Sequence, residues 1–230
     1  MTVSIRRGNE RGAVDFGWLK SRHTFSFGSY YDPAHMGVSA LRVINDDRVD
    51  AGAGFDTHSH RDMEIISYVK RGVIEHRDSM GNTRQLPPGE FQLMSAGSGI
   101  THSEYNASSS EPLEFLQIWI QPEVTGIEPG YQQKAFVREP GLQLIASSDA
   151  RGQSLKLHQD AALYRAWLEH GAKADLDVAP GRTVYVHVVS GGLEVGRGQL
   201  REGDGISLRD ATRVELCGQD EAEALVFDLP

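Results

Sequence analysis

Several features are scarce in this chain, and each scarcity excludes a class of protein. Cys217 is the single cysteine among 230 residues, so an internal disulfide and a thiolate-rich structural zinc site are both excluded. Lys and Arg form no run and the net charge is -9, which argues against direct binding to nucleic acid or to a membrane surface. No apolar stretch approaches membrane-spanning length, and the first residues, MTVSIRRGNERGAVDF, lack the apolar segment of a signal peptide. We therefore expect a cytoplasmic protein without a nucleic-acid or membrane partner.

The chain does contain short apolar runs, which predict strands. They are rich in β-branched and aromatic residues and end at Gly, Pro, Asn or Asp, as in the turn Pro87-Pro88-Gly89. The segment Asp160–His170 has the composition of a helix, but it precedes a second group of strands, so we expect a strand there. The pattern is typical of an all-β sandwich or barrel, and its clearest runs are Met63–Val69, Gly72–His76, Gln92–Ser95, Leu113–Ile120, Thr183–Val189 and Ala224–Leu229.

A weak internal repeat indicates two copies of one β-unit. The segment Tyr68–Glu75 resembles Val188–Val195, and Leu86–Glu90 resembles Leu200–Asp204 in the same order. The polar stretch Gln132–Gly141 is the predicted linker between the copies.

Two spacings of metal-ligand residues fall in the first copy. His58 and His60 are two residues apart, and so are His102 and Glu104. Because side chains two apart on a strand point to the same face, two such strands can direct three imidazoles and one carboxylate at a single point. When the two copies are aligned, these four ligand positions correspond to Val178, Pro180, Leu216 and Gly218 in the second copy. None of these residues offers a metal-ligating side chain, so only the first copy is expected to bind a metal.

This ligand set favours a catalytic metal over a structural one. Imidazole suits Fe, Cu, Ni and Zn, the carboxylate adds a hard oxygen, and the set leaves about one or two positions open for water, substrate or dioxygen. Glu64 could be a further ligand, a carboxylate that orients an imidazole, or a member of a buried ion pair. His76 is expected to be structural or to support the site. The remaining histidines lack a partner at ligand spacing and are expected to be structural: His23, His35, His158, His170 and His187.

These residues resemble the cupin superfamily, and within it the pirin family. Gly52, His58, His60 and Glu64 follow the first cupin motif, although the closing Gly72 comes one residue late. Gly99, His102 and Asn106 follow the second motif, but Gly97 stands where that motif has proline. The first half of the chain carries the more specific pirin signatures, whereas the second half resembles the family only loosely. The signatures are HTFSFGSYYDPAHMG (His23–Gly37), GFDTHSHRDMEIISYV (Gly54–Val69), EHRDSMGN (Glu75–Asn82) and AGSGITHSEYN (Ala96–Asn106).

The resemblance implies a bicupin, in which two tandem jelly-roll barrels follow each other. The expected domains are residues 1–135, an N-terminal cupin barrel with the metal, and residues 136–230, a degenerate barrel without metal ligands. The implied ligands are the side chains of His58, His60, His102 and Glu104, and Glu64 is assigned to a supporting position. The implied cofactor is one divalent transition metal, with Fe(II) expected first and Cu, Mn, Ni, Co or Zn as alternatives. No further cofactor is expected.

The resemblance also implies an activity, because bacterial members are linked to quercetin 2,3-dioxygenase. We expect a flavonol substrate whose heterocyclic ring is opened with O2 and loss of CO, with Glu104 as general base. Pocket-wall candidates, for which ordinary core packing is an equal alternative, are Phe25, Phe27, Met63, Phe91 and Met94. The alternatives are a metal-binding regulatory protein with little turnover, as eukaryotic pirins are described, and another cupin activity. A monomer is expected, and a protein partner remains open.

Overall fold

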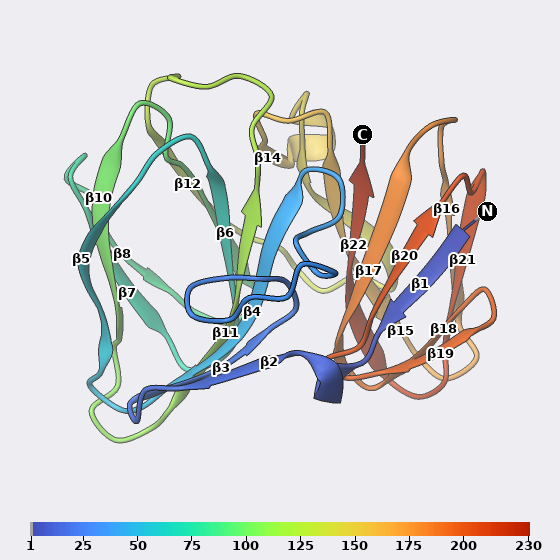
Figure 1. Ribbon diagram of the computed structural model, residues 1–230, viewed down its shortest axis with the longest axis horizontal. Helices are drawn as coiled ribbons and strands as arrows, with labels where there is room; N and C mark the ends of the chain where they lie inside the picture. Colours follow the sequence, from blue (N-terminus) through green and yellow to red (C-terminus); the bar gives the residue numbers. More distant parts are fainter. Residues whose placement is uncertain (1) are drawn as a thin grey trace. The chain divides into compact units, whose positions relative to one another are not determined.

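The computed structural model describes residues 2–230, which are built almost entirely of strands (Figure 1). Within these residues there are 22 strands and two three-residue 3-10 helices, η1 (Gly8–Glu10) and η2 (Arg151–Gln153). The predicted all-β fold is confirmed. Over the same range no helix has the length and apolar character needed to cross a membrane.

The chain divides into two compact units, each with its own sheets. The N-terminal barrel comprises Gly12–Gly37 and Leu41–Val137, and the C-terminal barrel comprises residues 2–11, Val38–Ala40 and Arg138–Pro230. The expected limits of 1–135 and 136–230 therefore need a correction at the N-terminus. The reason is that the first strand, β1 (Thr2–Arg6), pairs with β20 (Gly205–Arg209) of the C-terminal barrel (Figure 1).

The N-terminal barrel consists of a seven-stranded and a four-stranded sheet. The seven-stranded sheet has the order β12-β9-β6-β11-β4-β3-β2, and the four-stranded sheet has the order β5-β10-β7-β8. Their bounds are β2 (Gly12–Asp15), β3 (Leu19–His23), β4 (Leu41–Val49), β5 (Gly54–His60), β6 (Glu64–Arg71), β7 (Ile74–Asp78), β8 (Thr83–Leu86), β9 (Glu90–Ser95), β10 (Ile100–Asn106), β11 (Leu113–Ile120) and β12 (Gly130–Ala135).

The C-terminal barrel has the same two-sheet construction. Its larger sheet has the order β1-β20-β17-β22-β15-β13-β14, and its smaller sheet has the order β16-β21-β18-β19. The strands not yet bounded are β13 (Gly141–Ser147), β14 (Leu155–Lys156), β15 (Ala162–Leu168), β16 (Lys173–Asp177), β17 (Thr183–Ser190), β18 (Gly192–Val195), β19 (Gly198–Arg201), β21 (Arg213–Gly218) and β22 (Ala222–Leu229).

The matching strand orders confirm the internal repeat. The run β9-β6-β11-β4-β3 corresponds to β20-β17-β22-β15-β13, and β5-β10-β7-β8 corresponds to β16-β21-β18-β19. One part of the sequence alignment was wrong. In the N-terminal barrel His102 pairs with His58. In the C-terminal barrel Leu216, which corresponds to His102, pairs with Ala174. The position equivalent to His58 is therefore Ala174 and not Val178.

The segment with helical composition is a strand, as expected from its place in the chain. Strand β15 lies within Asp160–His170 and pairs with β13 on one side and β22 on the other. Most of its side chains are buried, because the strand is central in its sheet. Burial between two neighbouring strands outweighs the helix propensity of this segment.

The interior of the N-terminal barrel has polar side chains between two apolar clusters. Along β6 the inward positions are Ile65, Ser67 and Val69, and along β11 they include Phe115, Gln117 and Trp119. Ile65 belongs to the apolar cluster with Met94, Ala96 and Ile100. Val69 and Phe115 belong to the other cluster, whose buried members also include Leu19, Val49, Ile74, Leu86 and Leu113. The two clusters thus support a polar layer that contains the candidate ligands.

Candidate metal centre

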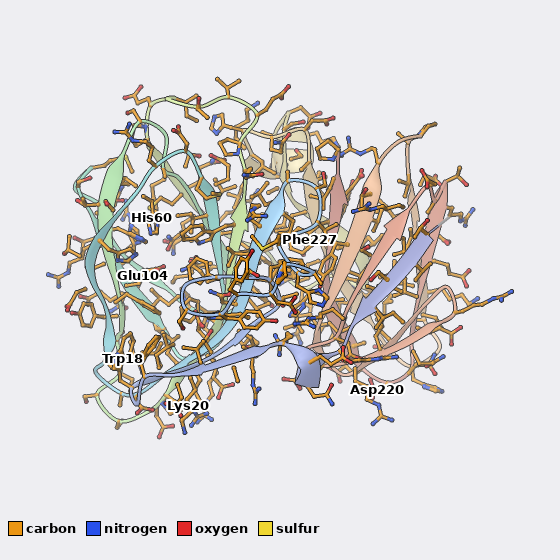
Figure 2. The ribbon with its side chains drawn as sticks, in the orientation of Figure 1. Trp18, Lys20, His60, Glu104, Asp220 and Phe227 are labelled. Atoms are coloured by element: carbon orange, nitrogen blue, oxygen red, sulfur yellow. The ribbon has the colours of Figure 1, made fainter. Side chains whose placement is uncertain are left out.

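Three histidines meet inside the N-terminal barrel. His58 and His60 come from β5, and His102 comes from the neighbouring strand β10, where it pairs directly with His58. One ring nitrogen from each of the three lies within 4.8 Å of the others. The ring centroids are 4.5–4.9 Å apart. Figure 2 shows His60 and Glu104 in the space between the sheet with β5 and β10 and the sheet with β6.

The histidines are held in the form that binds metals. Nδ1 of His58 lies 2.7 Å from the carbonyl oxygen of Asp56, so this nitrogen donates its hydrogen and Nε2 is left as the ligand atom. Burial, reinforced by the neighbouring histidines, lowers the pKa of His60 to about 4 and that of His102 to about 2. The rings of His60 and His102 are therefore neutral at pH 7, as metal coordination requires.

His102 provides the test of whether a metal fits. Its side chain is buried, and neither ring nitrogen has a hydrogen-bond partner among residues 2–230. Buried polar atoms are almost always paired, so an imidazole without any partner, facing two other imidazoles, requires a ligand. The residues present thus fit a divalent metal.

Glu104 lies beside this triad. The β5–β10 ladder shifts register between His102 and Glu104. As a result Glu104 pairs with Phe55, whereas an unbroken ladder would pair it with Asp56. It falls within 4.8 Å of His102 and His76 in a second group of ligand residues. The structure therefore brings the three predicted imidazoles together and places the predicted fourth ligand next to one of them.

The carboxyl group of Glu104 is fully buried but well supported. Ser67 Oγ donates to Oε1 at 3.3 Å and Gln117 Nε2 donates to Oε2 at 2.9 Å. Burial raises the pKa of Glu104 to about 7, while these two hydrogen bonds oppose the rise. Each oxygen retains a further lone pair for a metal or a proton.

His76 is a neighbour of the site whose ring is already engaged. Its Nε2 lies 3.0 Å from Asp78 Oδ2, and its Nδ1 accepts from Gln92 Nε2 at 3.4 Å. Burial lowers the pKa of His76, which favours the neutral ring. Since both nitrogens have partners, His76 packs against His102, at 5.3 Å between ring centroids, and positions it.

Glu64 lies away from the ligand groups. Its carboxylate is buried on β6 and accepts a hydrogen bond from Ser95 Oγ at 3.1 Å. It belongs to neither group of metal-binding residues found within residues 2–230. The structure therefore gives Glu64 a role in joining β6 to β9.

A cavity of about 240 Å³ opens beside the histidines. This is just below the range of about 300–1,000 Å³ typical of drug-sized ligands, so it suits a small molecule. His58, His60 and Glu104 line it together with an apolar wall of Val14, Phe16, Leu19, Phe27, Phe55 and Trp119. The prediction of Phe27 as a wall residue is confirmed. Phe25, Phe91 and Met94 are buried in the core, and Met63 packs against the cluster of Ile65.

The polar part of the cavity wall was missed at the sequence level. It comes from β3 and β4, which contribute Ser21, His23, Asn45 and Asp47. These residues are two apart on their strands, so they share the inward face. Strand alternation in the sequence shows that the two residues on each strand share a face, but it does not show that this face borders the cavity.

Comparison with known proteins now places the chain. The sequence pattern that defines the pirin family matches residues 5–120, and that of a quercetinase C-terminal cupin domain matches residues 144–229. The chain belongs to the pirin family. A quercetin 2,3-dioxygenase of Escherichia coli strain K12 is 50% identical over 228 residues, which are 99% of each chain.

Solved pirin structures have the same fold. The crystal structure of YhhW from Escherichia coli has a TM-score of 0.98 and 50% identity, and it covers 100% of this chain and 98% of that one. The bacterial pirin YhhW in complex with nickel(II) has a TM-score of 0.97 and 50% identity, covering 100% and 99%. Both confirm the predicted pair of cupin barrels for this pirin.

Proposed function

We propose that this pirin is a metal-dependent dioxygenase of the quercetin 2,3-dioxygenase type. It opens the heterocyclic ring of a flavonol with O2, whose two oxygen atoms enter the ester product while one ring carbon leaves as CO. The observation that carries the proposal is the convergence of three imidazoles, two of which, His58 and His60, line a cavity with aromatic walls. The 50% identity to the quercetin 2,3-dioxygenase of Escherichia coli supports it.

In this proposal the metal is held by His58, His60 and His102, with Glu104 as the fourth ligand. The donor set of three nitrogens and one oxygen suits Fe(II), which we propose as the resident metal, and also Ni(II) and Cu(II). When bound, the metal supplies a Lewis acid that lowers the pKa of a coordinated substrate hydroxyl.

The protein side chains then handle the proton and the substrate. Glu104 accepts the proton of the flavonol 3-hydroxyl at a carboxylate oxygen, while Ser67 and Gln117 keep the carboxyl group in place. The rings of Phe27 and Trp119, whose centroids are 5.1 Å apart, form an apolar wall that orients a flat aromatic ligand and excludes water.

We further propose that the C-terminal barrel is structural and binds no metal. The positions equivalent to His58 and His102 are Ala174 and Leu216, which offer no ligand atom. We propose a cytoplasmic location, supported by the single, unpaired Cys217, and a monomeric state. Size-exclusion chromatography with light scattering tests the oligomeric state, because a dimer would double the mass from 25.3 kDa.

The activity test uses purified protein loaded separately with Fe(II), Ni(II), Cu(II), Mn(II) and Co(II). Loss of flavonol absorbance, O2 uptake and CO release are followed together, and each should proceed in equal amounts. Absence of turnover with all five metals would refute the dioxygenase proposal. Metal binding without turnover would instead favour a regulatory or interaction protein.

A further inference from the structure

The cavity beside the histidines carries a second polar patch, formed by Asn45 and Asp47 on β4. Both line the same cavity as His58, His60 and Glu104. Because they are two residues apart on a strand, both side chains point to the barrel interior, as the buried positions of β4 indicate. Asn45 pairs across the sheet with Gln117, the donor to Glu104, and Asp47 pairs with Ser21.

Both side chains contain an acceptor oxygen without a donor. Asn45 is 3% exposed and Asp47 is 4% exposed. Within the part of the chain that the structure describes, neither Asn45 Oδ1 nor Asp47 Oδ1 receives a hydrogen bond. Buried acceptors are rarely left unpaired, so two of them on one cavity wall call for a donor that enters the cavity.

The opposite kind of group is present on the apolar wall. Trp119 Nε1 is a buried donor that lines the cavity and has no acceptor among residues 2–230. A ligand that matches the cavity must therefore bring hydrogen donors to β4, an acceptor to Trp119 and an apolar aromatic body between them. A flat aromatic ring system with phenolic hydroxyl groups supplies both the apolar body and the donors for β4. Its ring or carbonyl oxygens supply the acceptor for Trp119.

We propose that Asn45 and Asp47 form a subsite that binds a hydroxyl group of the substrate distinct from the one that reacts at the metal. This inference rests on the proposed flavonol oxygenation and narrows its substrate class to polyhydroxylated aromatics. The subsite selects substrates by accepting hydrogen bonds from phenolic O–H groups. Asp47 contributes most, because a carboxylate is a stronger hydrogen-bond acceptor than the amide oxygen of Asn45. Burial raises the pKa of Asp47 to about 7, while the Ser21 hydroxyl opposes this rise.

The test compares two flavonols that differ only at the remote positions. Quercetin carries hydroxyl groups on both outer rings, whereas 3-hydroxyflavone retains only the reactive hydroxyl. The variants are Asp47→Leu, which keeps the shape of the side chain but removes both oxygens, and Asn45→Leu. The matched control is Asp46→Leu, because Asp46 is the adjacent residue on β4 and is paired with Lys70 at 2.6 Å.

For metal-loaded wild type we expect kcat/KM for quercetin to exceed that for 3-hydroxyflavone by about tenfold or more, as for a hydrogen bond to a charged acceptor. Asp47→Leu should abolish this ratio by raising KM for quercetin much more than KM for 3-hydroxyflavone, and Asn45→Leu should reduce it. The Asp46→Leu control should retain the ratio. An unchanged ratio in Asp47→Leu would overturn the proposal and would mean that water satisfies the two acceptors.

Binding separates this inference from the proposed function. Dissociation constants for both flavonols are measured by quenching of tryptophan fluorescence, which Trp119 in the cavity wall should report. If no flavonol is turned over, the dioxygenase proposal fails, but a preference for quercetin that is lost in Asp47→Leu still supports the subsite. If wild type binds both flavonols equally, the subsite is refuted whether or not turnover occurs. Thermal melting verifies that each variant is folded.

Discussion

His102 faces His58 directly across the β5–β10 ladder, and the ladder changes register immediately afterwards. This single shift sets Glu104 opposite Phe55. Glu104 follows His102 by two residues on β10, so its carboxyl group also lies inside the barrel, next to His102 and His76. The geometry of the site therefore depends on how closely the backbones of β5 and β10 approach each other, and on this point Gly54 is decisive.

Gly54→Ala should distort the site without touching a ligand. A Cβ atom there would meet the carbonyl oxygen of Glu104 and lie 2.6 Å from Cα of Tyr105, and backbone atoms cannot move aside cheaply. We expect a loss of about 1–3 kcal/mol in unfolding free energy and weaker metal binding. Gly130→Ala is the control, because the nearest atom to its Cβ would be 4.0 Å away. Urea unfolding and metal titration of both variants measure the effect, and equal behaviour of the two would contradict this reading.

His102→Ala should abolish stoichiometric metal binding. His102 is the most enclosed of the three imidazoles, and His58 and His60 alone offer two nitrogens. We expect bound metal after dialysis to fall from about one equivalent to nearly none. Inductively coupled plasma mass spectrometry measures the metal, and His170→Ala in the C-terminal barrel, an exposed histidine, is the control. Full metal content in His102→Ala would rule out the proposed centre.

Glu104→Gln should slow turnover more than it weakens metal binding. The amide keeps the size of the carboxyl group and an acceptor for Gln117, but it cannot take a proton. We expect kcat to fall about 10²- to 10⁴-fold, the usual contribution of a general base. Glu64→Gln is the comparison, since Glu64 bonds to Ser95 and not to the histidines. If Glu104→Gln retained the kcat of the wild type, Glu104 would not be the general base.

Asp47 should make the metal-free protein less stable as the pH rises. The pKa of Asp47 is about 7 in the folded protein and near the ordinary aspartate value of 3.8 in the unfolded chain, so the folded state binds the proton more tightly. The unfolding free energy should therefore fall from about pH 4 to pH 7, by at most about 1.4 kcal/mol per pH unit, and level off above. The difference between wild type and Asp47→Asn, measured by urea unfolding from pH 5 to pH 8, isolates this carboxyl group. A pH-independent difference would show that Asp47 titrates alike in both states.

The fold and the imidazole triad were readable from sequence because both depend on local alternation. His58 and His60 lie two apart on one strand, so their shared face follows from strand geometry alone. The strand at Ala162–Leu168 was predictable only from its position in the repeat, since its own composition favours a helix.

Other parts of the site depend on pairing between distant strands, which a single sequence does not reveal. The register shift beside Glu104 arises from the β5–β10 ladder, and the nearness of His76 to His102 arises from the β7–β10 ladder. The polar wall of Asn45 and Asp47 was missed because their significance appears only when β4 is known to face the cavity. Strand β1 was assigned to the wrong unit for the same reason, since its partner β20 lies at the far end of the chain.

The pairing of β1 with β20 has a consequence for the order of events during synthesis. The residues of the N-terminal barrel, up to Val137, are complete on the ribosome well before Gly205–Arg209 has been made. The metal-binding barrel can fold early, whereas Thr2–Arg6 must wait for its partner strand with unpaired backbone groups. Slowing translation across the last third of the chain should therefore prolong the lifetime of an intermediate with a folded N-terminal barrel and an unpaired N-terminal strand. Aggregation and proteolysis at the N-terminus should be fastest in this intermediate.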